Sequence, residues 1–130
     1  MADKNVFFLI RKTAKEEVAS IAIDHALGCL TVLEFEVEPM VAFAGDGVLN
    51  VLKEQEGMDT YGVDSVEERV KMLLMSDVKV LALKDDMDRL GITEEMITDA
   101  KEYDAEEAVT PVSWKEILKG MEEADMVMFF

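Results

Sequence analysis

Apolar residues in this chain gather in short unbroken runs, which are separated by longer stretches where apolar and charged positions alternate with a helical period. A short run rich in β-branched and aromatic residues predicts a strand buried on both faces. "NVFFLI" near the start of the chain is a clear example. The predicted strands cover residues 5–10, 36–44, 78–83, 107–112 and 125–130.

The stretches between the runs predict helices, because apolar side chains recur every three or four residues and capping residues stand near several starts. The predicted helices cover residues 14–33, 48–55, 64–76, 93–103 and 113–124, and residues 84–92 form a turn or a short helical piece. The expected caps are Thr13 with Glu16, Asp64 or Ser65, Thr93, and Ser113 with Glu116. The expected buried stripe of the third helix consists of Val66, Val70, Leu73 and Leu74.

Strands that alternate with helices of this length favour parallel pairing. We therefore expect an α/β fold, a three-layer α/β/α sandwich with a mostly parallel five-stranded sheet. The chain has 130 residues and no internal repeat or linker, which predicts a single domain over residues 1–130.

The first predicted helix, residues 14–33, has hardly any polar face between Val18 and Leu33. A helix that is apolar on nearly all sides must be covered on more than one side. The sheet can cover one side, and we expect a neighbouring subunit to cover the other. The sequence therefore predicts an oligomer.

The charge balance narrows the range of partners. Thirteen basic residues stand against 29 acidic ones, for a formal net charge of −16. Such a surface repels phosphate groups, so we expect no direct binding to nucleic acid or to anionic membranes. No apolar stretch reaches the length of a membrane span, and the only cysteine, Cys29, fits a reducing compartment. The expected location is the cytoplasm.

The glycine-containing loop Gly45, Asp46 and Gly47 follows the second predicted strand and could aim main-chain N–H groups at an anion. It matches neither the dinucleotide-binding nor the P-loop pattern, and Asp46 puts a negative charge where a phosphate would bind. We prefer the interpretation that the glycines permit a sharp turn and that Asp46 caps the next helix. The alternative is a small-ligand loop.

Cys29 is the only candidate nucleophile of the cysteine type, but it lies late in an apolar helix, where burial and the helix dipole raise the pKa of a thiol. His25 and Cys29 have the i, i+4 spacing of a metal pair, yet the chain contains no further His or Cys to complete a zinc site. A zinc site shared between subunits is the remaining alternative. We expect no metal and no cofactor within one chain.

In order along the chain, "FFLIRKTA", "VAFAGDGVLNVLK", "VKVLALKDDMDRLGI" and "ADMVMFF" resemble the DsrE/DsrF/DsrH family of small intracellular sulfur-relay proteins, and most closely its DsrF/TusC branch. The resemblance covers nearly the whole chain. The fold of the family agrees with the α/β sandwich expected above. The resemblance also implies that the chain works in an assembly with DsrE-like and DsrH-like subunits, or with copies of itself.

The resemblance places the sulfur-carrying cysteine of DsrE/TusD-type subunits at the end of the third strand, which corresponds to Leu83 or Lys84 here. Neither is a cysteine, and Cys29 does not match the first-helix cysteine of DsrH/TusB-type subunits, which aligns near Ile23 to His25. The resemblance thus implies a non-catalytic DsrF/TusC-like subunit that serves tRNA thiolation or sulfur oxidation. The alternatives are a homo-oligomer that binds a small ligand at the subunit interface and a weak sulfurtransferase that uses Cys29.

Overall fold

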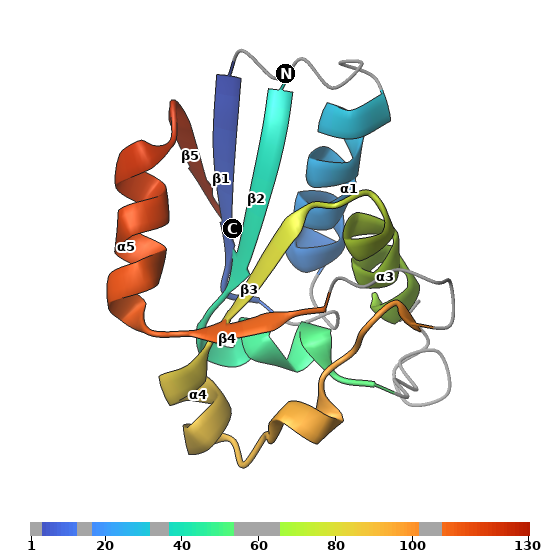
Figure 1. Cartoon of the computed structure of the whole chain (residues 1–130), viewed down its shortest axis with the longest axis vertical. Helices are drawn as coiled ribbons and strands as arrows, with labels where there is room; N and C mark the ends of the chain where they lie inside the picture. Colours follow the sequence, from blue (N-terminus) through green and yellow to red (C-terminus); the bar gives the residue numbers. More distant parts are fainter. Residues whose placement is uncertain (1–3, 13–16, 32–36, 54–65, 102–107) are drawn as a thin grey trace.

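A computed structural model describes residues 4–12, 17–31, 37–53, 66–101 and 108–130. Its sheet has five strands in the order β4-β3-β2-β1-β5, and every neighbouring pair is parallel (Figure 1). The strands are β1 Lys4–Ile10, β2 Val37–Phe43, β3 Lys79–Leu83, β4 Thr110–Val112 and β5 Met126–Phe129. The five predicted strands are confirmed.

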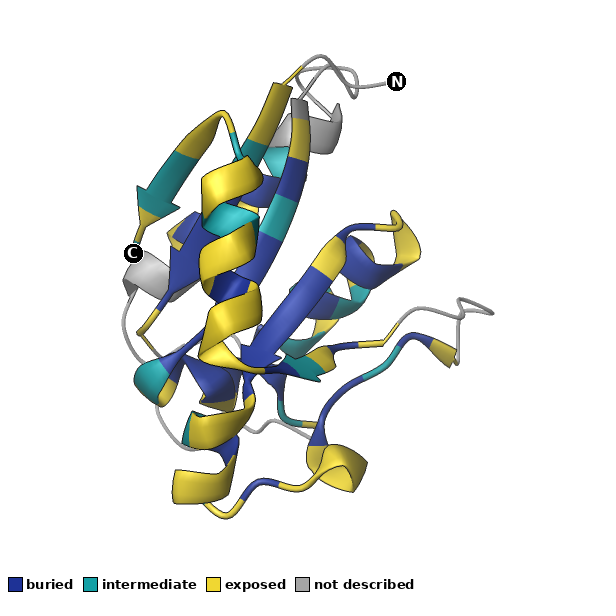
Figure 2. Cartoon of the chain, turned by 60° about the vertical axis from the view of Figure 1, so that its left-hand side comes forward, coloured by how far each residue is buried: buried dark blue, intermediate teal, exposed yellow. Residues whose placement is uncertain are grey.

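Helices cover both faces of the sheet. The α-helices are α1 Glu17–Thr31, α3 Glu67–Met75, α4 Lys84–Arg89 and α5 Trp114–Glu123, and the 3-10 helices are η1 Gly45–Val51 and η2 Glu94–Met96. α1 and α3 lie on one face, and α5 lies on the other (Figure 1). Most residues of α5 are exposed, whereas the strands beneath it are largely buried (Figure 2). The predicted three-layer α/β/α sandwich is therefore confirmed. In the described part of the chain, no helix is long and apolar enough to cross a membrane.

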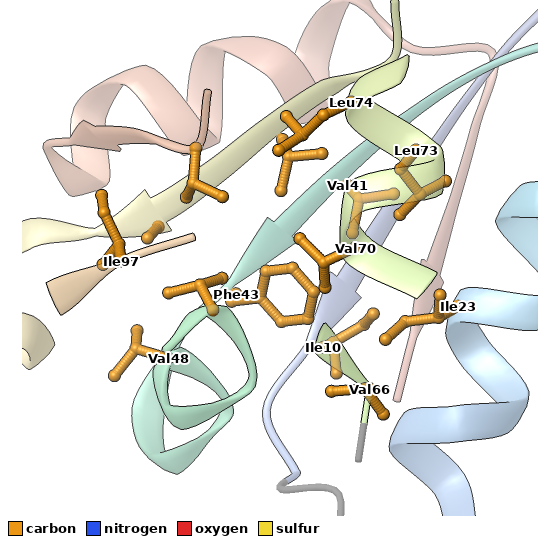
Figure 3. Close-up of a cluster of buried hydrophobic side chains, with 14 of the residues drawn as sticks. Ile10, Ile23, Val41, Phe43, Val48, Val66, Val70, Leu73, Leu74 and Ile97 are labelled. Carbon is orange, nitrogen blue, oxygen red and sulfur yellow. The ribbon is translucent and has the colours of Figure 1, made fainter. Parts of the chain in front are cut away.

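β1 is buried on both faces because its alternate side chains enter two different cores. Phe8 and Ile10 belong to the larger cluster, under α1 and α3, whereas Phe7 and Leu9 belong to the smaller cluster, under α5. Figure 3 shows how side chains from β1, β2, α1, α3 and η1 meet in the larger cluster. Each large apolar side chain that is fully buried contributes roughly 1.5–3 kcal/mol of transfer free energy.

Two predicted helix features can be compared with the structure. The predicted stripe of α3 is confirmed, since Val66, Val70, Leu73 and Leu74 are all buried. Ser113 caps α5 as predicted, because its Oγ accepts the Glu116 N–H at 3.4 Å. The proposed caps Thr13, Glu16, Asp64 and Ser65 lie outside the described residues.

Two predicted α-helices are wrong in the part that the structure describes. Residues 45–51 form a 3-10 helix, and in the segment predicted at 93–103 the described residues contain the short 3-10 helix Glu94–Met96 in place of a continuous α-helix. The two segments instead lie side by side: Leu52 forms a β-bridge with Ile97, and the Thr98 N–H donates to the Val51 carbonyl at 2.6 Å. These tertiary hydrogen bonds use main-chain groups that an α-helix would need, so they override the helical propensity.

α1 is less uniformly apolar than the sequence suggested. Its residues Ala22, Ile23 and Ala26 are buried, but Asp24 and His25 are exposed. Asp24 pairs with Arg69 of α3 at 3.2 Å. Ile21 is 46% exposed, so α1 keeps an exposed apolar side chain that a neighbouring subunit would cover, and that contact stays a prediction.

Candidate functional site

The candidate site lies at the carboxyl ends of the strands, since ligands of open α/β sheets commonly bind there. Here β2 continues through Ala44 into η1, and β3 continues directly into α4. η1 contacts both β3 and α4. The loop Gly45 to Gly47 therefore lies beside the end of β3, where Leu83 and Lys84 stand.

The two glycines of the loop serve different purposes. Gly45 has a φ of +58°, a left-handed conformation that side chains with a Cβ adopt at a cost. Gly47 packs against the end of β1, where an added Cβ would collide with the carbonyl oxygen of Ile10 and approach the Cα of Arg11 to 3.0 Å. The expected sharp turn is confirmed, and close packing against β1 is the further reason for Gly47.

Carboxylates surround the loop. The Gly45 N–H donates to Oδ2 of Asp86 in α4 at 2.7 Å. Arg89 approaches Oδ1 of the same carboxylate at 3.2 Å and Oδ1 of Asp46 at 3.5 Å. A carboxylate from the next βα unit thus binds the Gly45 N–H group that an anionic ligand would need.

Asp46 does not cap the helix, and this prediction is wrong. The N-cap position of η1 is Ala44, and Asp46 lies in the first turn with its side chain 67% exposed. η1 starts at Gly45, three residues before the predicted helix start, so the N-cap position moves from Asp46 to Ala44. The side chain of Asp46 therefore extends outward toward Arg89.

Asn50 anchors the other end of η1. It is 1% exposed, and its Nδ2 donates to the carbonyls of Lys12 at 2.7 Å and of Gly47 at 3.0 Å. Asn50, Asp86 and Arg89 were not among the site residues predicted from the sequence. The available signal for the last two was their i, i+3 spacing directly after a buried strand.

The structure does not bring Cys29 to the carboxyl ends of the strands. α1 starts after the carboxyl end of β1 and runs back toward the amino end of β2 (Figure 1), and Cys29 stands two residues before the last residue of α1. The main chain of Cys29 therefore lies near the amino ends of the strands, away from the loop. Its side chain is outside the described residues. The Nδ1 atom of His25 lies 2.8 Å from the Ile21 carbonyl oxygen, within its own helix.

Two surface hollows lie away from the loop. One, of about 250 Å³, opens at the amino ends of β1 and β2 and is lined by Phe7, Met40, Glu38, Lys79 and Glu123, among others. The other, of about 280 Å³, is lined by residues around 97–101 and 108–111.

Asp99 lines the second hollow. The N–H of Lys101 donates to its Oδ1 at 3.1 Å and, with the nearby Lys53 ammonium, lowers the pKa of Asp99.

Among the residues that the structure describes, no group of three His, Cys, Asp or Glu side chains could hold a metal ion.

Comparison with known proteins gives two positive findings. The model of the "DsrE/DsrF-like family" matches residues 4–130. Among solved structures, the chain is similar to the ychN protein from E. coli, with a TM-score of 0.78, 20% sequence identity and 100% of both chains covered. No curated protein matches.

Two further solved structures share the fold. One is the protein of unknown function MTH1491 from Methanobacterium thermoautotrophicum, with a TM-score of 0.71, 16% identity, and 98% of this chain and 100% of that chain covered. The other is the conserved protein of unknown function BT1422 from Bacteroides thetaiotaomicron, with a TM-score of 0.66, 10% identity, and 98% and 96% covered. At these identities the likeness shows the fold alone.

Proposed function

The chain belongs to the DsrE/DsrF-like family, and from this premise we propose that it is a cytoplasmic, non-catalytic subunit of a sulfur-relay complex, of the DsrF/TusC type. In this role the chain builds the complex, and a related subunit carries sulfur as a persulfide on its own cysteine. The partners are DsrE-like and DsrH-like subunits, and the pathway is tRNA thiolation or sulfur oxidation.

The observation that carries the proposal is the end of β3. The strand ends at Leu83, which is 8% exposed, and α4 begins at Lys84. Relay subunits that this chain resembles hold their cysteine at this position. Persulfide transfer requires a thiolate as the attacking group, and neither an alkyl nor an ammonium side chain can supply one.

The alternative sulfurtransferase would have to use Cys29. Its main chain lies near the amino ends of the strands, so a sulfur atom on Cys29 would be remote from the Gly45–Gly47 loop and from the carboxyl end of β3. The small-ligand alternative is also weakened, since the Gly45 N–H already donates to Asp86. In the proposed role, the loop and α4 form a rigid support beside the reactive site of a neighbouring subunit.

The test is to isolate the tagged chain from its native cells and to measure the mass of the intact complex. We expect a fixed stoichiometry with a related subunit that has a cysteine at the end of its third strand. The isolated complex is then given a persulfide donor labelled with heavy sulfur, and mass spectrometry locates the label. The label should appear on the partner subunit.

Cys29→Ala is the matched variant for this experiment. We expect the variant to enter the complex and to support the same rate of label transfer. The proposal is overturned if label accumulates on Cys29 and transfer stops in Cys29→Ala while the complex stays intact. It also fails if the tagged chain captures no related subunit.

A further inference from the structure

β5 forms one edge of the sheet, and in the described part of the chain it pairs only with β1. An edge strand presents unpaired main-chain N–H and C=O groups that can bind another strand. The edge of β5 also carries the two most exposed large apolar side chains among the described residues, Met126 at 57% and Phe129 at 62%.

The hydrogen bonds to β1 identify which groups face outward. Phe130 uses both of its main-chain groups on β1, because its N–H donates to the Leu9 carbonyl at 2.9 Å and its carbonyl accepts from the Arg11 N–H at 3.0 Å. Main-chain direction alternates along a strand, so Met128 also faces β1, and Val127 and Phe129 direct their N–H and C=O groups away from it.

We propose that the β5 edge is a self-association surface, on which β5 of a second copy pairs in antiparallel orientation about Met128. This register places Val127 opposite Phe129 of the second copy, so that the outward groups meet in about four main-chain hydrogen bonds. It also places Met126 opposite Phe130 of the second copy. Both of the strongly exposed side chains, Met126 and Phe129, then gain an apolar neighbour.

Charge favours a second copy as the occupant. The exposed Asp125 stands directly before β5, and the exposed Arg11 lies beside its other end, through the bond between Arg11 and Phe130. In an antiparallel pair about a two-fold axis, the acidic end of each strand faces the basic end of the other. The net charge of −16 opposes association, but at physiological salt such long-range repulsion is screened beyond about 8 Å. The pairing does not depend on the sulfur-relay role.

The first measurement is sedimentation equilibrium of the purified full chain and of Phe129→Pro. Proline removes the outward N–H of Phe129 and leaves the bonds of Met128 and Phe130 to β1 in place. We expect a concentration-dependent dimer whose dissociation constant rises at least tenfold in Phe129→Pro. Leu118→Ala, which changes an exposed apolar residue of α5, should leave the dissociation constant unchanged.

The second measurement tests the register with cysteines in a Cys29→Ala background. In the proposed pair, Met128 of one copy lies opposite Met128 of the second copy, at a spacing that suits a disulfide. Mild oxidation should therefore link Met128→Cys into a dimer and should link Val127→Cys much more slowly, because Val127 is opposite Phe129 of the second copy.

The third measurement tests the charge pairing and controls for damage to the fold. Arg11→Glu and Asp125→Lys should each weaken self-association, and an equal mixture of the two variants should recover it, because the mixed dimer restores both opposite-charge pairs. Asp125 also accepts the Asn5 N–H at 2.8 Å, but a fold weakened by that loss would gain nothing from mixing.

Three outcomes would overturn the proposal. A monomer at all concentrations would remove the second copy as the occupant. A dimer that persists unchanged in Phe129→Pro would place the contact elsewhere, for example on α1. Binding of an added extended peptide to the β5 edge without any self-association would assign the surface to a different protein. None of these outcomes bears on whether sulfur is relayed by a partner.

Discussion

Gly47 and Asp86 hold the Gly45–Gly47 loop at the carboxyl ends of the strands by different physical means. Gly47 permits contact between two main chains, because the position of its missing Cβ is filled by Ile10 and Arg11. Asp86 supplies a charged acceptor to the Gly45 N–H, whose left-handed turn directs it toward α4. Neither role requires a ligand.

Gly47→Ala should lower the free energy of unfolding by about 1 to 3 kcal/mol, since the added methyl group meets rigid main chain that cannot move aside cheaply. The measurement is equilibrium unfolding in urea. The matched control is Gly28→Ala in α1, where an added Cβ meets nothing within 4 Å. Alanine is the better helix former there, so Gly28→Ala should raise stability by roughly 0.5–1 kcal/mol. Equal effects of the two substitutions would contradict the packing argument.

At the scale of elements, η1 and α4 form one unit because Asp86 and Arg89 of α4 both contact the start of η1. The two carboxylates near Arg89 differ in burial. The side chain of Asp86 is 20% exposed and binds a main-chain N–H at 2.7 Å, whereas that of Asp46 is 67% exposed and lies 3.5 Å from the guanidinium. Their contributions to stability should differ accordingly.

Asp86→Ala should therefore destabilise the protein by about 1.5 to 3 kcal/mol, the usual range for hydrogen bonds to a charged group. Asp46→Ala should cost at most about 1 kcal/mol, because an exposed ion pair contributes little. Thermal unfolding of the two variants beside the unchanged protein tests this order. If Asp46→Ala proved the more damaging, the loop would depend on its ion pair with Arg89.

At the scale of the whole molecule, the acidic charge limits what the surface can bind. For the tRNA branch of the proposed function, the net charge of −16 predicts that this chain does not contact the tRNA itself. The purified chain should retain no tRNA on a filter at about 0.15 M salt, because it repels the phosphate backbone. A partner subunit would then have to hold the tRNA. Binding by the isolated chain that weakens as salt rises would contradict this prediction.

Local patterns predicted the strands well and two of the helices poorly. The runs "NVFFLI" and "VKVLAL" are strands because unbroken apolar runs of this length suit a strand buried on both faces and are too short for a buried helix. The segment 93–103 has a helical pattern but bridges to Leu52 instead. Its partner is more than 40 positions away in the sequence, and a pattern within the segment cannot report such a contact.

The amino-acid sequence by itself determined the class of fold, the buried strands "NVFFLI" and "VKVLAL" and the acidic net charge, because these depend on composition and on the spacing of apolar residues. It also determined that the third strand ends in Leu83 and is followed by Lys84, neither of which is a cysteine. The tertiary structure alone decided the strand order, which leaves β5 at an edge, and the convergence of Gly45, Asp86 and Arg89. Those features arise from contacts between residues far apart in the chain, and their energies depend on a geometry that exists only once the sheet has formed.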